Sequence, residues 1–86
     1  MDQVIIGVDL GGTQVRTARF NLALDLLERW AEPTLAHEGP QRVIPRLLDA
    51  IARVMPDDPS SVIGIGVSAP GPINPRTGMI VSPPNL

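Results

Sequence analysis

A carboxylate placed between an apolar segment and a glycine-rich turn is the clearest sign of chemistry in this sequence. Asp9 follows the apolar segment Val4–Val8 and stands shortly before Gly11, Gly12 and Thr13. Glycines lack a Cβ atom, so the turn can take positive φ and let backbone N–H groups approach an anion, while Thr13 adds a hydroxyl donor. The Asp9 carboxylate is the hard oxygen ligand that a phosphate-bound Mg²⁺ needs, usually through water. These residues favour a magnesium-phosphate site.

The same residues also fit a plain β-hairpin. A Gly-Gly pair between two apolar segments is a favoured tight turn whatever it binds. Arg16, three residues after Thr13, could face a phosphate or pair with a neighbouring carboxylate. The chain contains no lysine, which excludes a Walker-type phosphate loop within it. Taken alone, the Asp9 segment leaves both interpretations open.

A second glycine-rich segment lies further along the chain. Gly64–Pro72 reads Gly-Ile-Gly-Val-Ser-Ala-Pro-Gly-Pro, and Pro84–Leu86 reads Pro-Asn-Leu. The beginning of Gly64–Pro72 imitates the dinucleotide-binding fingerprint, which has to open a helix. Proline at positions 70 and 72 prevents a clean helix start there. We therefore expect these glycines to allow the close approach of another strand or a ligand.

Together, Asp9–Thr13, Gly64–Pro72 and Pro84–Leu86 resemble the ROK family. This family contains bacterial glucokinases, fructokinases and N-acetylhexosamine kinases, together with sugar-responsive repressors. The first motif is shared with hexokinases, actin and heat-shock chaperone ATPases, whereas the second is more particular to ROK proteins. The resemblance implies that residues 1–86 are the N-terminal part of an actin-like ATPase domain that stops before the catalytic residues.

The resemblance implies an ATP-dependent, glucokinase-like hexose kinase, which transfers the γ-phosphate of ATP to a sugar hydroxyl. In such a protein Asp9 would organise Mg²⁺, and the phosphates of ATP would be held by Gly11, Gly12 and Thr13. The longer protein is expected to be a homo-oligomer. These roles come from the family, and they agree with the magnesium-phosphate interpretation of the residues themselves.

The same resemblance places Gly71 and Asn85 near the sugar. Gly71 would lie beside it in the cleft between two lobes, although a proline-rigid loop needed only for shape explains Gly71 nearly as well. ROK kinases take the proton of the sugar hydroxyl with an aspartate downstream of the Pro-Asn-Leu segment. No catalytic residue is therefore assigned within the chain, and the chain alone is expected to be inactive.

Two other functions remain open. A ROK-type repressor would bind a sugar and DNA, and such proteins carry a winged helix-turn-helix ahead of the first motif. Only three residues precede Val4, so the kinase is expected unless the chain is trimmed at its start. A nucleotide-binding or structural module that does not catalyse is the third possibility. An Asn-Asp pair soon after Leu86 and a second glycine-rich loop downstream would identify the kinase.

The composition agrees with a piece of a cytoplasmic enzyme. The chain has 86 residues, a net charge of −2 and no cysteine, which excludes disulfides and thiolate metal sites within it. Its seven cationic residues are all arginine and are scattered, so we expect no nucleic-acid partner. No apolar segment is long enough to cross a membrane, and no basic leader is present. We therefore expect no membrane partner and a cytoplasmic location.

Strands are predicted on both sides of the turn. Val4–Val8 lacks polar alternation, which suits a strand buried on both faces, and Thr13–Phe20 alternates like its hairpin partner. Leu26–Glu32 has helical propensity, but the resemblance implies a third antiparallel strand, which we adopt. Val62–Val67 is predicted to run parallel to the first strand after a right-handed crossover. Met79–Val81 could form one more short strand.

One helix is predicted before the parallel strand. Apolar residues at helical spacing form a single stripe: Val43, Ile44, Leu47, Leu48, Ile51, Val54 and Met55. Proline is tolerated only near the start of a helix, so Pro45 places that start near Arg42, and Pro56 stops it. The predicted fold class is α/β, a ribonuclease-H-like half domain with a three-stranded antiparallel meander, a crossover helix and a further parallel strand.

Overall fold

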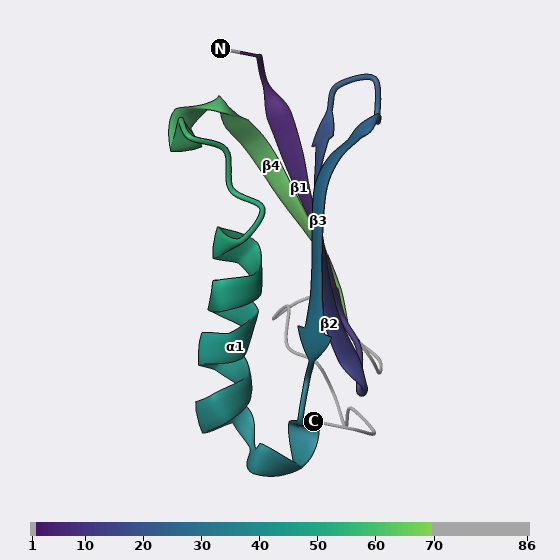
Figure 1. Cartoon of the computed structure of the whole chain (residues 1–86), viewed down its shortest axis with the longest axis vertical. Helices are drawn as coiled ribbons and strands as arrows, with labels where there is room; N and C mark the ends of the chain where they lie inside the picture. Colours follow the sequence, from purple (N-terminus) through teal and green to yellow (C-terminus); the bar gives the residue numbers. More distant parts are fainter. Residues whose placement is uncertain (1, 70–86) are drawn as a thin grey trace, which may run out of the picture.

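Four strands form one sheet in the order β3-β2-β1-β4 (Figure 1). In the computed structural model, which describes residues 2–69, they are β1 (Val4–Leu10), β2 (Gln14–Asn21), β3 (Leu26–Pro33) and β4 (Val62–Ser68). The first three pair antiparallel, and β4 runs parallel to β1. This arrangement confirms the predicted meander and parallel strand. The predicted strand Met79–Val81 lies outside the described residues.

β1 buries one of its two faces. Every second residue is buried: Val4, Ile6, Val8 and Leu10. Asp9, on the opposite face, is exposed. The helix α1 (Pro40–Ala52) packs on the buried face, and no helix or strand among residues 2–69 covers the other. The prediction that β1 is buried on both faces is therefore wrong for the described part of the chain.

β3 forms against its local propensity. Its residues favour a helix, yet they pair with β2 from Pro33 opposite Gln14 to Leu26 opposite Phe20. Most of β3 is exposed, so pairing with β2 rather than burial holds it in place. Pro33 ends the strand as predicted, because proline has no N–H for the ladder. The implied third strand is confirmed.

α1 begins and ends earlier than predicted, since it stops at Ala52 and not at Pro56. Gly39 precedes it with a φ of 84°, and Pro40 occupies its first turn, where the fixed φ of proline suits a helix start. The prediction of a start near Arg42 is therefore wrong by two residues, and Pro45 lies inside the helix. Pro45 cannot donate to the carbonyl of Gln41. Gln41 is exposed, so water can satisfy that carbonyl instead.

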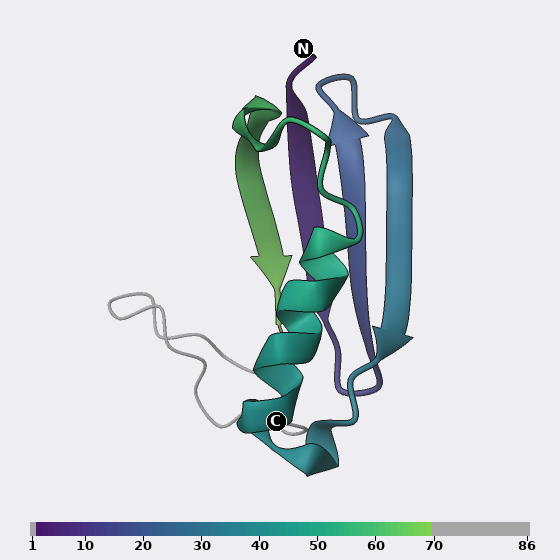
Figure 2. The same ribbon diagram turned by 60° about the vertical axis from the view of Figure 1, so that its left-hand side comes forward.

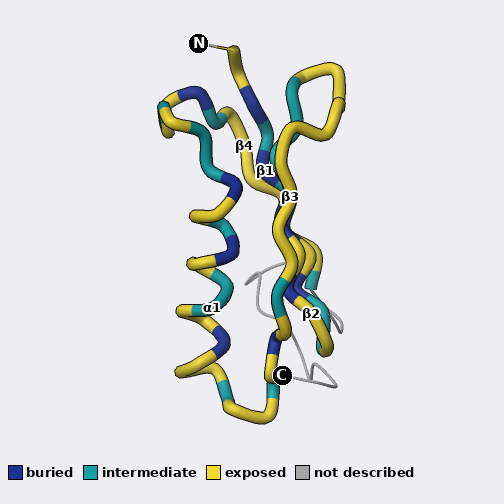
Figure 3. Tube along the Cα trace, in the orientation of Figure 1, coloured by how far each residue is buried: buried dark blue, intermediate teal, exposed yellow. Residues whose placement is uncertain are grey.

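The predicted apolar stripe of α1 coincides only partly with the face that packs. Val43 and Ala50 are buried, whereas Ile44 is 50% exposed and Leu48 60% exposed. The buried positions lie on the side of α1 that faces the sheet (Figure 3). α1 packs over β1 and β2, and β4 lies beside it (Figure 2). On β4, Ile65 is 52% exposed, so apolar surface next to α1 stays open in the described part of the chain.

Two side chains of β2 hold the end of α1 and the turn that follows it against the sheet. The Thr17 hydroxyl donates to the carbonyl oxygen of Ala50 at 2.6 Å, and the Arg19 guanidinium donates to that of Val54 at 3.1 Å. Carbonyls near the end of a helix lack donors from the helix itself, and Thr17 is buried. These hydrogen bonds fix α1 relative to the hairpin of β1 and β2. Within residues 2–69, no helix has the length and apolar character needed to span a membrane.

Candidate functional site

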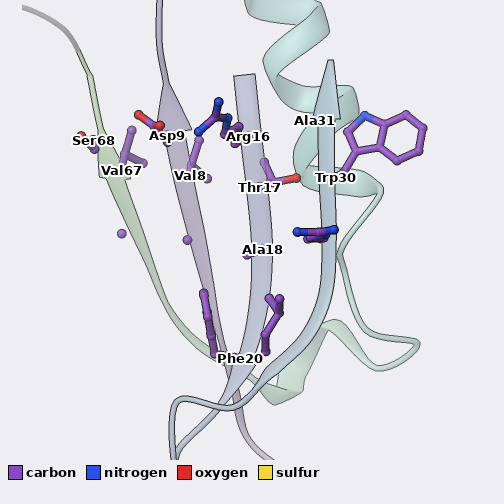
Figure 4. A pocket seen from close by; sticks show the side chains of 14 residues that line it. Val8, Asp9, Arg16, Thr17, Ala18, Phe20, Trp30, Ala31, Val67 and Ser68 are labelled. Carbon is purple, nitrogen blue, oxygen red and sulfur yellow. The ribbon is translucent and has the colours of Figure 1, made fainter. Parts of the chain in front are cut away.

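Asp9 lies near the end of β1, on the sheet face opposite α1. Its partners across the sheet are Arg16 of β2 and Ser68 of β4 (Figure 4). Asp9 is exposed, and the two ion pairs formed within residues 2–69 lie elsewhere. No hydrogen bond within the same residues engages its side chain. Its carboxylate oxygens are therefore available to a cation or to water.

Arg16 binds its neighbour Gln14 rather than Asp9. Its Nε and Nη2 atoms donate to Gln14 Oε1 at 3.2 and 3.1 Å. Of the two roles considered for Arg16, an ion pair with a neighbouring carboxylate is not formed within residues 2–69. Contact with a phosphate stays a prediction. The pairing of β1 with β2 still brings a positive charge next to Asp9, where it can attract a polyanion.

The turn between β1 and β2 is shaped by close approach rather than by positive φ. The Gly11 N–H donates to the Gln14 carbonyl oxygen at 2.9 Å. A Cβ atom on Gly11 would lie 2.9 Å from that same oxygen, which is too close for a side chain. Among residues 2–69, the glycine with positive φ is Gly39. Gly11 and Gly12 therefore do not use the positive φ that glycine permits.

Several hydrogen-bond donors in this turn lack an acceptor in the described part of the chain. The N–H groups of Gly12 and Thr13 have no partner among residues 2–69, nor does the Thr13 hydroxyl, and Thr13 is exposed. Neighbouring backbone N–H groups in a turn can bind an anion. The predicted hairpin is confirmed, and it brings such donors close to the Asp9 carboxylate. This combination suits an anion that carries its own cation, such as a magnesium-bound phosphate.

Arg46 joins this end of the sheet to α1. Its guanidinium donates from Nη1 to the Thr34 carbonyl oxygen and from Nη2 to Glu38 Oε1, both at 2.6 Å. The hydrogen bond from Arg46 holds the pKa of Glu38 below its ordinary value, against a smaller opposing effect of desolvation. The positive charge of Arg46 lowers this pKa further. Glu38 is therefore a carboxylate that the fold prefers in its charged form.

We expect Glu38→Gln to lower the melting temperature by no more than a few degrees at neutral pH, since the pair is partly exposed. A carboxylate whose pKa is lowered in the folded state stabilises the fold above its unfolded pKa, near 4.5. That contribution is lost as the pH falls through the folded pKa. The difference between wild type and Glu38→Gln should therefore vanish in acid. Melting followed by the fluorescence of Trp30, the one tryptophan, measures it, and a difference that persists unchanged in acid would contradict the assignment.

The open face of the sheet forms a hollow of about 990 Å³ (Figure 4). Its floor includes small residues: Gly7, Ala18 and Gly66. Polar side chains gather at one end of it, where Asp9, Arg16 and Ser68 lie on adjacent strands. Arg29 of β3 also lines the hollow, but the only carboxylate among its described lining residues is Asp9, next to the turn.

The Gly-x-Gly segment lies inside a strand. Gly64 and Gly66 both belong to β4, and they do not open a helix as the dinucleotide fingerprint requires. The dinucleotide interpretation is excluded, as predicted. A Cβ atom on either glycine would meet nothing within 4 Å. The close approach predicted for these glycines is therefore not formed within residues 2–69.

Magnesium fits this site when it is shared with phosphates. No group of three or more His, Cys, Asp or Glu side chains lies together within residues 2–69, so the described residues form no cage for a metal. Mg²⁺ is usually bound by one or two carboxylates together with phosphates and waters. One exposed carboxylate beside N–H donors that have no acceptor in the described part of the chain matches that mode of binding.

The structure places some predicted site residues and adds others. Gly71 and Asn85, predicted to lie near the sugar, are outside the described residues. Sequence reasoning missed Thr34, which donates a hydrogen bond to the turn, and Arg46, which donates one to Thr34. No motif marks them, because their role depends on contacts between segments distant in the chain.

Two glucokinases and a xylose repressor are similar to nearly the whole of this sequence. The chain is 32% identical over 88 residues to a glucokinase of Halalkalibacterium halodurans, covering 99% of the chain and 27% of that protein. It is 32% identical over 82 residues to a glucokinase of Thermotoga maritima, covering 95% and 25%. It is 29% identical over 86 residues to a xylose repressor of Caldicellulosiruptor bescii, covering 95% and 21%. The chain thus spans about a quarter of the length of these relatives.

The fold occurs in a solved structure, that of a ROK family glucokinase from Streptomyces griseus in complex with glucose and AMPPNP. The two superpose with a TM-score of 0.81 at 21% identity, over 96% of this chain and 25% of that one. This likeness shows a shared fold. The ROK family profile matches residues 5–86, nearly the whole sequence. The chain therefore belongs to the ROK family.

Proposed function

We propose that the chain is the N-terminal, phosphate-binding segment of an ATP-dependent hexose kinase similar to glucokinases. The observation that carries this proposal is the Asp9 carboxylate, without an ion pair among residues 2–69, beside the N–H donors of Gly12 and Thr13. Support comes from two relatives named as glucokinases and from the structural neighbour with glucose and AMPPNP bound. Since the chain spans about a quarter of its relatives, a longer protein would supply the remaining machinery.

Each residue of the turn has a role in this proposal. Asp9 would hold Mg²⁺ through water, and the bound ion would neutralise charge on the phosphates. Gly12 and Thr13 would donate hydrogen bonds to phosphate oxygens, while Gly11 keeps the turn tight. Arg16 would add a positive charge nearby. Phosphoryl transfer depends mainly on positioning and charge stabilisation, and these residues would supply both on one side of the phosphates.

Contact with the sugar is proposed for a part of the chain outside the described residues. Gly71 and Asn85 remain the candidates, on the basis of the family motifs that contain them. The base that takes the proton of the sugar hydroxyl would come from a later part of the longer protein. The same proposal treats residues 1–86 as one N-terminal segment of an actin-like ATPase domain.

A sugar-responsive repressor is the second candidate. The similarity to a xylose repressor favours it, because ROK kinases and repressors share this segment. A repressor would use the fold to bind a sugar, without any need for phosphoryl transfer. A non-catalytic nucleotide-binding module is a third candidate. Such a module would need only the phosphate-binding turn and no catalytic base.

A coupled assay on the longer protein with ATP, Mg²⁺ and a panel of hexoses tests the proposal. We expect ATP-dependent and Mg²⁺-dependent phosphorylation, with glucose among the substrates. Sugar binding with DNA binding but no ATP consumption would replace the kinase with the repressor. Binding of ATP with neither sugar binding nor turnover would indicate the non-catalytic module.

A further inference from the structure

Thr34 is hydrogen-bonded to the turn that follows β1. It comes immediately after β3 and is fully buried, with 0% of its surface exposed. Its hydroxyl donates a hydrogen bond to the Gly11 carbonyl oxygen at 2.7 Å, and its N–H donates to the Thr13 carbonyl oxygen at 2.9 Å. One buried residue therefore binds the turn at both ends.

The hydrogen bond to Gly11 also sets the direction of the next N–H group. A trans peptide unit is planar, so the C=O of Gly11 and the N–H of Gly12 point in opposite directions, and the described residues contain no cis peptide bond. Because the Gly11 carbonyl is directed at Thr34, the Gly12 N–H is directed away from it. That N–H has no acceptor among residues 2–69, so it is available to a ligand.

Thr34 is itself held by α1. Arg46 Nη1 donates to the Thr34 carbonyl oxygen at 2.6 Å, and Arg46 Nη2 donates to Glu38 at the same distance. The next residue, Leu35, has φ 52° and ψ 51°, a left-handed conformation that a residue with a side chain keeps only where its surroundings enforce it. Arg46 thus connects the turn to the helix, and the segment between them is tightly constrained.

We propose that Thr34 is a positioning residue for phosphate binding, supported by Arg46. The Thr34 hydroxyl keeps the Gly12 N–H aimed at the phosphates before ATP arrives, so binding does not have to order the turn. Neither Thr34 nor Arg46 touches the phosphates. The inference rests on the proposed function, since it requires phosphates to bind at this turn.

Two variants of Thr34 separate its hydroxyl from its volume. Thr34→Val removes the hydroxyl and keeps the shape, whereas Thr34→Ser keeps the hydroxyl. Residual dipolar couplings of the longer protein, labelled with ¹⁵N, report the direction of each N–H. We expect the Gly12 coupling to change in Thr34→Val and to stay close to wild type in Thr34→Ser, with the couplings of β1 unchanged in both.

Titration of the same samples with MgATP measures the effect on binding. The Kd obtained from shifts at Gly12 and Thr13 should rise about tenfold in Thr34→Val, equivalent to about 1.4 kcal/mol. In Thr34→Ser it should stay within about twofold of wild type. A merely structural role would lower the melting temperature without turning the Gly12 N–H, and serine would then restore stability only.

Arg46→Met provides a second variant if Thr34→Val fails to fold, because the Arg46 side chain is 19% exposed and lies nearer the surface. Arg53→Met is its matched control on α1's C-terminal side, where the Arg53 guanidinium contacts Asp49 and Trp30 instead. We expect Arg46→Met to change the Gly12 coupling and to weaken MgATP binding. Arg53→Met should do neither.

The possible failures are distinguishable. A Gly12 coupling unchanged in both Thr34→Val and Arg46→Met would overturn the positioning role, whether or not MgATP binds. If the wild-type longer protein instead shows no MgATP-dependent shift at Gly12 or Thr13 while the couplings change as expected, phosphate binding at this turn is overturned. That result would remove phosphate binding at the turn from the proposed function. Thr34 would then orient the Gly12 N–H without any ligand for it to bind.

Discussion

If the longer protein is the proposed kinase, replacing Asp9 with asparagine in it is expected to lower kcat about 100-fold or more, equivalent to about 3 kcal/mol of transition-state stabilisation. The substitution keeps the size and shape of the side chain but removes the charge that would hold Mg²⁺. Asp9 is exposed and makes no ion pair within residues 2–69, so the fold should lose little. The variant should also need more Mg²⁺ to reach its maximal rate.

If Asp9 is only a residue of a β-hairpin and binds no metal, the same variant should behave differently. Asparagine is as good a turn residue as aspartate, so kcat should then fall by no more than a few-fold. Measuring kcat against Mg²⁺ concentration, with melting temperatures alongside, separates the two cases. Asp57→Asn is a matched control, because Asp57 is also exposed but lies outside the site. A kcat near that of wild type in a stably folded Asp9→Asn variant would remove the metal role of Asp9.

The 86 residues by themselves are expected to give no measurable phosphorylation of any hexose. Phosphoryl transfer requires groups on both sides of the phosphates and a residue that orients the attacking hydroxyl. Within residues 2–69 the site offers one carboxylate, Asp9, which is assigned to the metal. The chain also spans about a quarter of its glucokinase relatives. A coupled assay with ATP, Mg²⁺ and several hexoses measures the turnover.

Contaminating kinases are the main hazard of that assay. An Asp9→Ala chain prepared in the same way measures this background, because contaminants keep their activity when Asp9 is changed. Turnover above the blank that disappears in Asp9→Ala would show that the 86 residues catalyse by themselves. It would contradict the assignment of the base to a later part of a longer protein.

The sequence by itself determined the local elements around Asp9. An apolar segment, a Gly-Gly turn and an alternating segment specify a strand, a tight turn and its hairpin partner through properties of the neighbouring residues alone. The helix was also predictable from the spacing of its apolar residues, although its start at Pro40 was missed by two residues. β3 required the resemblance to the ROK family, because its local propensity favours a helix.

Only the tertiary structure decided which faces are buried and what holds the turn. Ile44 and Leu48 belong to the apolar stripe by spacing, but their burial depends on what lies opposite them, and they are exposed. Thr34 reaches Gly11 across 23 positions of sequence, and Arg46 reaches Thr34 from α1. No local pattern specifies which distant carbonyl a threonine meets, because that contact is set by the pairing of β3 with β2 and by the docking of α1 on the sheet.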